Sequence, residues 1–489
     1  MSLDLKRSRK RMMETAWRGL TLHPLPLARW QNASLGHRLV GLVGSWRTES
    51  WLLQWAEALG AALMAIVLGF APFADTALVG VLLITCGAYW ALLTLADNQA
   101  SRITPIHWGV AVYWGLMAIA TAFSPEKKIA LTGLIKFSLF LFMFALGAEV
   151  LRSPRWRNGL VTFYLHISLI VAGYGIRQEY YGVEQLATWN DPNSVLADDT
   201  RVYSYLGNPN LLSSYLIPAI ALSIGAFFLW RGWLPKLLAI TIFLVNAACV
   251  FYTDSRGGWI ATVMMLGAFF LLLRAWFAPL MPRFWRRWLL PLVFGSFGGL
   301  LIAAILAVEK IRLRFTSIFA GREDSSNNYR INVWDAVWKM VQDHPVFGIG
   351  PGNGVFKKIY PLYAETGYEN ALGAYSIFLE HIAEIGWVGF AGFLWLLLLT
   401  VTYGVRVLVQ LRDRRDAQAF WLMAAIAAGT GLLAQGLFDT VWYRPAVNTL
   451  WWWMVAIVAS FSLDSSNAPT EAQPEILGDI SEASTLIEE

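Results

Sequence analysis

Three arginines stand beside polar turns in an otherwise apolar sequence. Arg201 comes shortly before Asn208 and Asn210, Arg256 lies in an Asp-Ser-Arg-Gly-Gly stretch, and Arg330 precedes a segment with helical spacing of apolar residues. A guanidinium group matches phosphate, carboxylate or bicarbonate oxygens in a two-pronged arrangement. A single arginine at the end of a membrane span can simply reach the lipid headgroups. Three on one side of a membrane predict a shared site for an anionic ligand.

A glycine-rich stretch, Gly348–Gly354, is a weaker candidate for an anion contact. Its backbone N–H groups, those of Gly350 and Gly352 among them, could contact an anion, and two lysines follow. The alternative is a turn that redirects the chain toward the membrane. No strand precedes the stretch, which argues against a nucleotide-binding fold.

The composition indicates what must position these residues. Hydrophobic residues make up 57% of the 489 residues and charged residues only 15%. Water-soluble domains carry about 25% charged residues, and disordered chains are far less apolar. The sequence therefore predicts an integral membrane protein. Nothing in it indicates a nucleic-acid partner.

Apolar runs long enough to cross about 30 Å of hydrocarbon recur along the chain and predict an all-α protein of about twelve transmembrane helices. The expected ranges are 51–71, 74–95, 105–122, 129–150, 159–179, 209–229, 234–252, 257–280, 289–308, 386–405, 419–438 and 445–463. Lys and Arg crowd residues 1–54 and alternate loops, which predicts a multi-pass protein with both termini cytoplasmic.

This reading divides the chain into three parts. Residues 1–50 form a basic cytoplasmic arm, 51–463 the membrane domain, and 464–489 an acidic disordered tail. A large extracytoplasmic loop, about 309–375, separates helices nine and ten. In it Ile331, Trp334, Trp338 and Val341 recur at helical spacing, which predicts an amphipathic helix on the membrane surface.

Other polar residues are weaker indications of a functional site. Lys136 lies inside an apolar span and needs a partner or a wet cavity, and Glu57 lies near the start of the first span; the sequence does not pair them. Cys86 and Cys249 lie in apolar runs and predict no disulfide framework. No cluster has metal-ligand spacing, so we expect no metal and no cofactor.

The order of these features resembles the O-antigen ligase and polymerase-like membrane proteins over about 180–460. That family implies about twelve helices, cytoplasmic termini and a large outer loop. The matching motifs are Arg201 with Asn208-Pro209-Asn210, Ser255-Arg256-Gly257, Arg330 with Trp334, and His344-Pro345 with Gly348-Ile349-Gly350-Pro351-Gly352. The resemblance implies a polyprenyl-diphosphate-linked glycan as donor.

One position departs from the ligases. Ser376 is followed by nine residues and then Gly386, as in the ligases, but Tyr375 stands where they carry His. That histidine is thought to assist sugar transfer. A phenol with a pKa near about 10 is a poor base at neutral pH, so Tyr375 is doubtful as a catalytic base.

Because the arginines are present without the histidine, the chain resembles a narrower subgroup, the cyanobacterial IctB family of bicarbonate transporters, which is linked to inorganic-carbon accumulation. The run Ala374–Glu380 and the Trp-rich N-terminal region also look like that subgroup. The resemblance implies a place in the plasma (inner) membrane. This leaves three hypotheses. The first is bicarbonate transport through an outward-facing arginine site. The second is a ligase-like glycosyltransferase, and the third is a non-catalytic membrane regulator. The partners expected are membrane lipid and either an anionic small molecule or a polyprenyl-diphosphate glycan.

Overall fold

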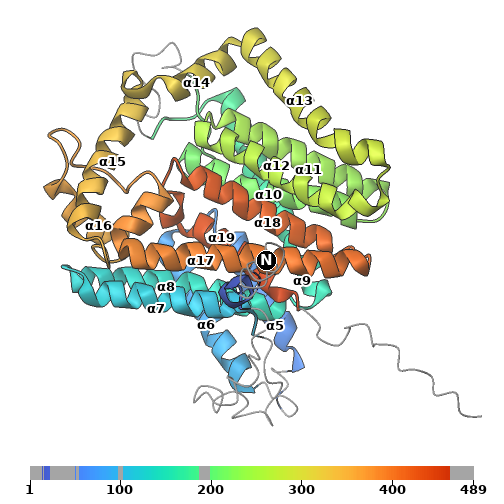
Figure 1. Cartoon of the computed structure of the whole chain (residues 1–489), viewed down its shortest axis with the longest axis horizontal. Helices are drawn as coiled ribbons and strands as arrows, with labels where there is room; N and C mark the ends of the chain where they lie inside the picture. The colour runs from blue at the N-terminus through green and yellow to red at the C-terminus, as the bar shows by residue number, and fades with distance from the viewer. Residues whose placement is uncertain are drawn as a thin grey trace, which may run out of the picture.

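A computed structural model describes residues 14, 16–22, 50, 54–96, 103–186 and 199–462. The basic arm therefore lies mostly outside the described residues, and the acidic tail lies wholly outside them. The described part is helical and contains no strand, which confirms the all-α prediction (Figure 1). Both cysteines are free and buried.

Each predicted apolar range contains a helix. Nine precede the large loop: α5 (Ala56–Phe70), α6 (Thr76–Ala96), α7 (Pro105–Phe123), α8 (Lys127–Val150), α9 (Pro154–Tyr181), α10 (Pro209–Leu229), α11 (Trp233–Tyr252), α12 (Arg256–Phe277) and α13 (Arg283–Ala307). Three follow it: α17 (Ile377–Asp413), α18 (Ala419–Gly436) and α19 (Pro445–Ser460).

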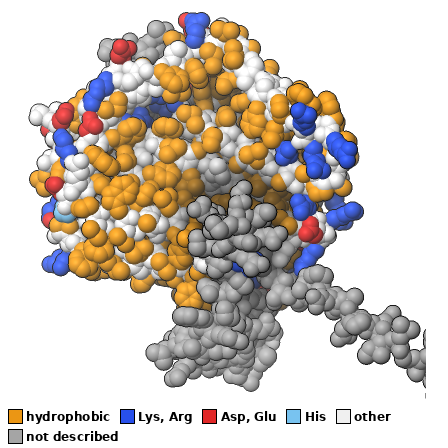
Figure 2. Space-filling model, viewed as in Figure 1, with side chains coloured by type: hydrophobic (Ala, Val, Ile, Leu, Met, Phe, Trp, Pro, Cys, Tyr) orange, Lys and Arg blue, Asp and Glu red, His pale blue; other side chains and the backbone are white. Residues whose placement is uncertain are grey.

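Ten of the described helices are long and apolar enough to cross a membrane, two fewer than expected. The two that fall short are α5 and α19, which have 15 and 16 residues. At about 1.5 Å rise per residue, either is shorter than the hydrocarbon layer. Hydrophobic side chains cover most of the visible face, and charged ones gather toward its margins (Figure 2). This arrangement suits a bilayer.

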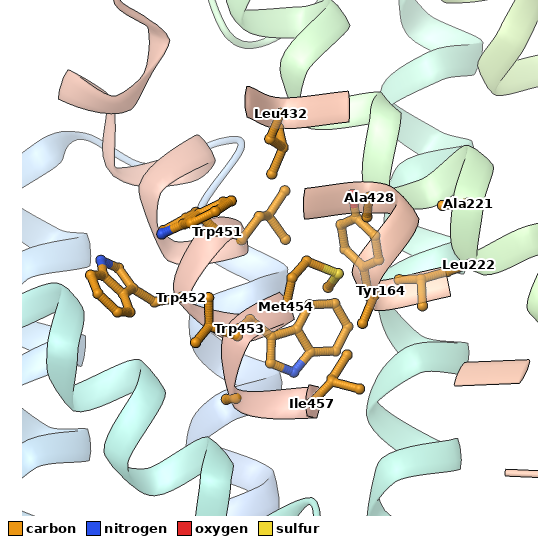
Figure 3. Close-up of a cluster of buried hydrophobic side chains, with 14 of the residues drawn as sticks. Tyr164, Ala221, Leu222, Ala428, Leu432, Trp451, Trp452, Trp453, Met454 and Ile457 are labelled. Atoms are coloured by element: carbon orange, nitrogen blue, oxygen red, sulfur yellow. The ribbon is translucent and has the colours of Figure 1, made fainter. Parts of the chain in front are cut away.

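The core forms around α19, which is buried along nearly its whole length. Three consecutive tryptophans point in different directions because successive residues are about 100° apart on a helix (Figure 3). Trp453 packs edge-on against Tyr164 of α9 at 5.3 Å between ring centroids. Trp452 contacts Phe144 of α8, and Trp451 contacts Trp442. These rings join α8 and α9 to the C-terminal helices.

The large loop builds a small core of its own. It contains α14 (Glu309–Phe319), α15 (Ser325–Asp343) and α16 (Asn353–Ile359), with short 3-10 turns at Gly321–Glu323 and Tyr360–Leu362. The predicted helix is present as α15, and its placement on the membrane surface stays a prediction. Val333, Val337 and Met340 are buried, whereas Trp338 is 45% exposed. The buried face turns toward α16 and the start of α17 because these elements share the loop's core.

The glycine-rich stretch braces a break in α17. At Gly386 the backbone has φ 63° and ψ −176°, a combination essentially restricted to glycine. The N–H of Ile349 donates to Ala383 O at 2.8 Å, and the N–H of Trp387 donates to Pro345 O at 2.8 Å. The loop thus takes up polar groups that the break frees on both sides. This explains the spacing between the His-Pro motif and Gly386.

Gly386→Ala is expected to destabilise the protein. A Cβ there would lie 2.2 Å from Val346 O, and the backbone conformation alone costs about 1–3 kcal/mol for other residues. The control is Gly267→Ala in α12, where a Cβ meets nothing within 4 Å. Tryptophan fluorescence during heating of the detergent-solubilised protein should show a lower Tm for Gly386→Ala only. Equal Tm values for the two variants would contradict the brace.

Candidate functional site

The three arginines line one cavity of about 750 Å³. Arg201 precedes α10, Arg256 opens α12, and Arg330 lies in the second turn of α15. Arg314 of α14 joins them, and the sequence analysis did not single it out. The structure therefore brings together the arginines that the sequence grouped on one side.

The N-caps of α10 and α12 position Asn210 and Arg256 at the cavity. Asn208 caps α10, because its side-chain oxygen accepts from the N–H of Asn210 at 2.8 Å, and Pro209 occupies the first turn. Asn210 is thereby directed into the cavity, while Asn208 does not line it. Ser255 caps α12 by accepting from the N–H of Gly258 at 3.1 Å, so Arg256 is the first residue of that helix.

Arg256 is held by the large loop. Its Nη1 donates to Ser317 O at 3.0 Å, and its Nη2 lies 3.0 Å from Asp324 Oδ1. Asp324 also caps α15 by accepting from the N–H of Asn327 at 2.9 Å. A single carboxylate therefore ties α12 to the start of α15.

Arg201 and Arg330 are held at the cavity by backbone carbonyls of two different segments. Arg201 donates to Thr253 O at 3.0 Å, and Arg330 donates to Phe438 O at 3.1 Å. Burial, together with the nearby positive charges of Arg314, Arg256 and Arg330, lowers the pKa of Arg201 to about 9, while Asp254 opposes the shift. The guanidinium groups thus repel one another, and a bound anion would relieve that repulsion.

Asp439 is the acidic residue that the sequence analysis missed. It follows α18, lines the cavity, and accepts a hydrogen bond from the side-chain amide of Asn210. Burial raises its pKa, although Arg330 pulls the pKa down. The signal was a lone Asp in the short Phe-Asp-Thr connection between two predicted spans on the same side as the arginines.

Tyr375 lies at the edge of this site. Its ring centroid is 5.8 Å from the guanidinium carbon of Arg330 and 5.8 Å from the ring of Tyr329. Burial raises the pKa of Tyr375 to about 12. The phenol therefore stays protonated at neutral pH, and its ring is placed to contact a cation rather than to accept a proton.

Gly350 and Gly352 lie elsewhere. The N–H of Gly350 donates to Glu384 O at 2.8 Å, and that of Gly352 donates to Glu384 Oε1 at 2.9 Å. A Cβ on Gly350 would lie 2.5 Å from the Ser124 hydroxyl oxygen, and one on Gly352 would lie 2.8 Å from Gly133 Cα. These contacts fit the turn interpretation. The N–H groups of Gly350 and Gly352 are therefore not part of the arginine cavity.

The remaining polar candidates are also away from the cavity. Lys136 and Glu57 are both exposed side chains on apolar helices, and neither lines the cavity. No group of three His, Cys, Asp or Glu side chains in the described ranges is arranged to hold a metal ion.

The cavity occupies one end of the helix bundle. Its residues come from the first turns of α10 and α12, the last turn of α18 and the large loop. Apolar side chains form part of its wall, including Ile260, Leu313 and Phe319. Beside α14, helix α13 has no buried residue and runs apart from the other spans (Figure 1). The arrangement can hold an anionic head next to an apolar tail.

Comparison with known protein families gives a match over part of the chain. Residues 239–394 match the family described as O-antigen ligase, a range that includes Arg256, Arg330 and Tyr375. No curated protein matches the chain. The narrower resemblance to the IctB family stays a prediction. Over residues 239–394 the chain is therefore similar to the O-antigen ligase family, and its described helices are those of a membrane protein.

Proposed function

We propose that this protein transfers a glycan from a polyprenyl-diphosphate donor to an acceptor hydroxyl at the outer face of the plasma membrane. The observation that carries the proposal is the convergence of four arginines in one cavity with an apolar wall. A diphosphate suits the guanidinium groups, and a polyprenyl chain suits the apolar side. The O-antigen ligase match supports the same reaction class.

The arginines would stabilise the leaving group. Transfer breaks the bond between the sugar's anomeric carbon and the diphosphate oxygen, and the diphosphate keeps the electron pair. Arg201, Arg256 and Arg330 would offset the charge that develops on that oxygen. The anomeric carbon then bonds to the acceptor oxygen.

Asp439 is our candidate for the base. The acceptor hydroxyl must lose a proton as the new bond forms, and a carboxylate whose pKa is raised by burial is a better base than an exposed one. Asp439 lines the same cavity as the arginines, so it can reach an acceptor that approaches the sugar there. Tyr375 would hold Arg330 through its ring.

Bicarbonate transport, our first hypothesis from the sequence, gains no support from the family match. A bicarbonate ion would suit the arginines but would leave the apolar wall without a role. The cavity also takes its lining from the first two turns of α12 and the last turn of α18, whereas a transporter needs a continuing path. Membrane topology, with cytoplasmic termini and the large loop outside, remains part of our proposal.

Arg256→Ala should weaken binding of farnesyl diphosphate to the purified protein by about 10- to 100-fold, the loss typical of a charge-assisted hydrogen bond. Arg274→Ala is the matched control, since Arg274 lies at the other end of α12 and does not line the cavity. Calorimetry in detergent gives both affinities. Unchanged binding by Arg256→Ala would contradict the diphosphate site. Labelled-bicarbonate uptake into liposomes that requires Arg256 would favour transport instead.

Asp439→Asn should reduce glycan transfer by about 10²- to 10⁴-fold, the usual contribution of a positioned base. Wild-type transfer should fall as the pH drops, because a raised pKa leaves Asp439 protonated at pH values where an ordinary aspartate is ionised. The acid limb should be missing from the residual activity of the variant. Release of polyprenyl diphosphate from a glucosylated donor in liposomes, with an oligosaccharide acceptor, measures both. An identical acid limb in the variant would exclude Asp439.

Tyr375→Phe should keep transfer within about threefold of wild type. The ring that contacts Arg330 remains, and the hydroxyl is not a base at neutral pH because its pKa is near 12. The same liposome assay measures the rate. A hundredfold loss would show that the hydroxyl takes part in the chemistry, and the assignment of the base to Asp439 would then be wrong.

A further inference from the structure

Gln435 is a fully buried amide at the arginine cavity. It lies in the last turn of α18, has no exposed surface, and lines the cavity. Its Cγ would lie 3.8 Å from a Cβ on Gly257, so it packs beside the residue that follows Arg256. Its function follows from how its side chain is oriented.

The orientation of this amide is fixed by two acceptors on α10. Its Nε2 donates to Asn210 O at 2.8 Å and to the Ser213 hydroxyl oxygen at 2.7 Å. A backbone carbonyl can only accept, so the nitrogen must face α10 and Oε1 must face away from it. That oxygen has no hydrogen-bond partner within the described part of the chain.

A buried acceptor without a partner is unfavourable, and such groups mark places where a ligand or water completes the structure. The hydrogen bonds of the nearby Arg256 and Arg330 go to other acceptors. Arg256 donates to Ser317 and Asp324, and Arg330 donates to Phe438 and Ser326. The missing donor is therefore expected to come from the ligand.

We infer that Gln435 Oε1 accepts a hydrogen bond from a hydroxyl or amide N–H of the sugar attached to the diphosphate. This inference rests on the proposed function. An ionised diphosphate has no donor hydrogen to offer, whereas every hexose carries several. The position fits, because Asn210 links Gln435 to both Arg201 and Asp439. A sugar there would lie between the leaving group and the base, and Gln435 would make the site prefer a glycosylated carrier over the bare one.

Two probes with the same tail test this inference: farnesyl diphosphate and glucosyl farnesyl diphosphate, bound to the purified full-length protein in detergent. The wild type should bind the glucosylated probe about tenfold more tightly than the bare one. In Gln435→Leu this preference should disappear, while affinity for the bare probe stays within about threefold. The matched control is Asn448→Leu, since Asn448 Oδ1 also has no partner but Asn448 does not line the cavity.

A change in the ligand covers the case in which Gln435→Leu does not fold. A glucosyl probe whose hydroxyls are replaced by fluorine has no donor hydrogen and should bind the wild type no better than the bare diphosphate.

If the preference survives in Gln435→Leu or with the fluorinated probe, the inference is overturned and the proposed function stands. If neither farnesyl probe binds the wild type, the proposed function itself fails. If bicarbonate alone displaces the glucosyl probe from wild type but not from Gln435→Leu, the donor is bicarbonate and the sugar assignment is wrong.

Discussion

Asn210 is the residue on which the cavity most depends. Its N–H is capped by Asn208, its amide donates to Asp439, its side-chain oxygen accepts from Arg201, and its backbone oxygen accepts from Gln435. These contacts join the start of α10 to the end of α18. Each partner is partly or fully buried, where an unmade hydrogen bond is expensive. The Asn-Pro-Asn segment therefore holds the start of α10 against the end of α18. It contributes to the site by fixing this contact.

The charges in this cavity are balanced rather than positive. Four arginines line it, and so do four acids: Asp254, Glu323, Asp324 and Asp439. Asp254 is also bound by Lys310 at 3.0 Å, which ties α14 to the turn before α12. An incoming anion must take the place of these carboxylates, above all that of Asp324 at Arg256. Such exchange limits affinity, and limited affinity would suit the reaction that we propose, in which a diphosphate must be released after each transfer.

Hydrophobic runs predicted the helices because a span's length and apolarity are written into consecutive residues. Successive spans cross the membrane in alternate directions, so each connecting turn can be assigned to one side. This assignment placed the three arginines on the same side. It missed Asp439 and Gln435, whose importance depends on which helices are neighbours, and sequence spacing does not state that α10 and α18 pack together. The stripe through Trp338 predicted α15 itself but not the second apolar face, with Val333 and Val337, that is buried in the loop's own core. Which partner covers an apolar face depends on the tertiary packing, and residue spacing does not state it.

The replacement of the family histidine by Tyr375 need not remove the chemistry. Position 375 is reached through the loop, which the glycine stretch fixes against the break in α17, whereas Asp439 is positioned by α18 and Asn210. The two positions belong to different elements, so one can lose its base while the other keeps a carboxylate among the arginines. Tyr375 still places an aromatic face near Arg330, an attractive contact for a cation. Under the proposed function, the arginine cavity is the part that the fold must preserve, and the base could come from another helix that reaches the same cavity.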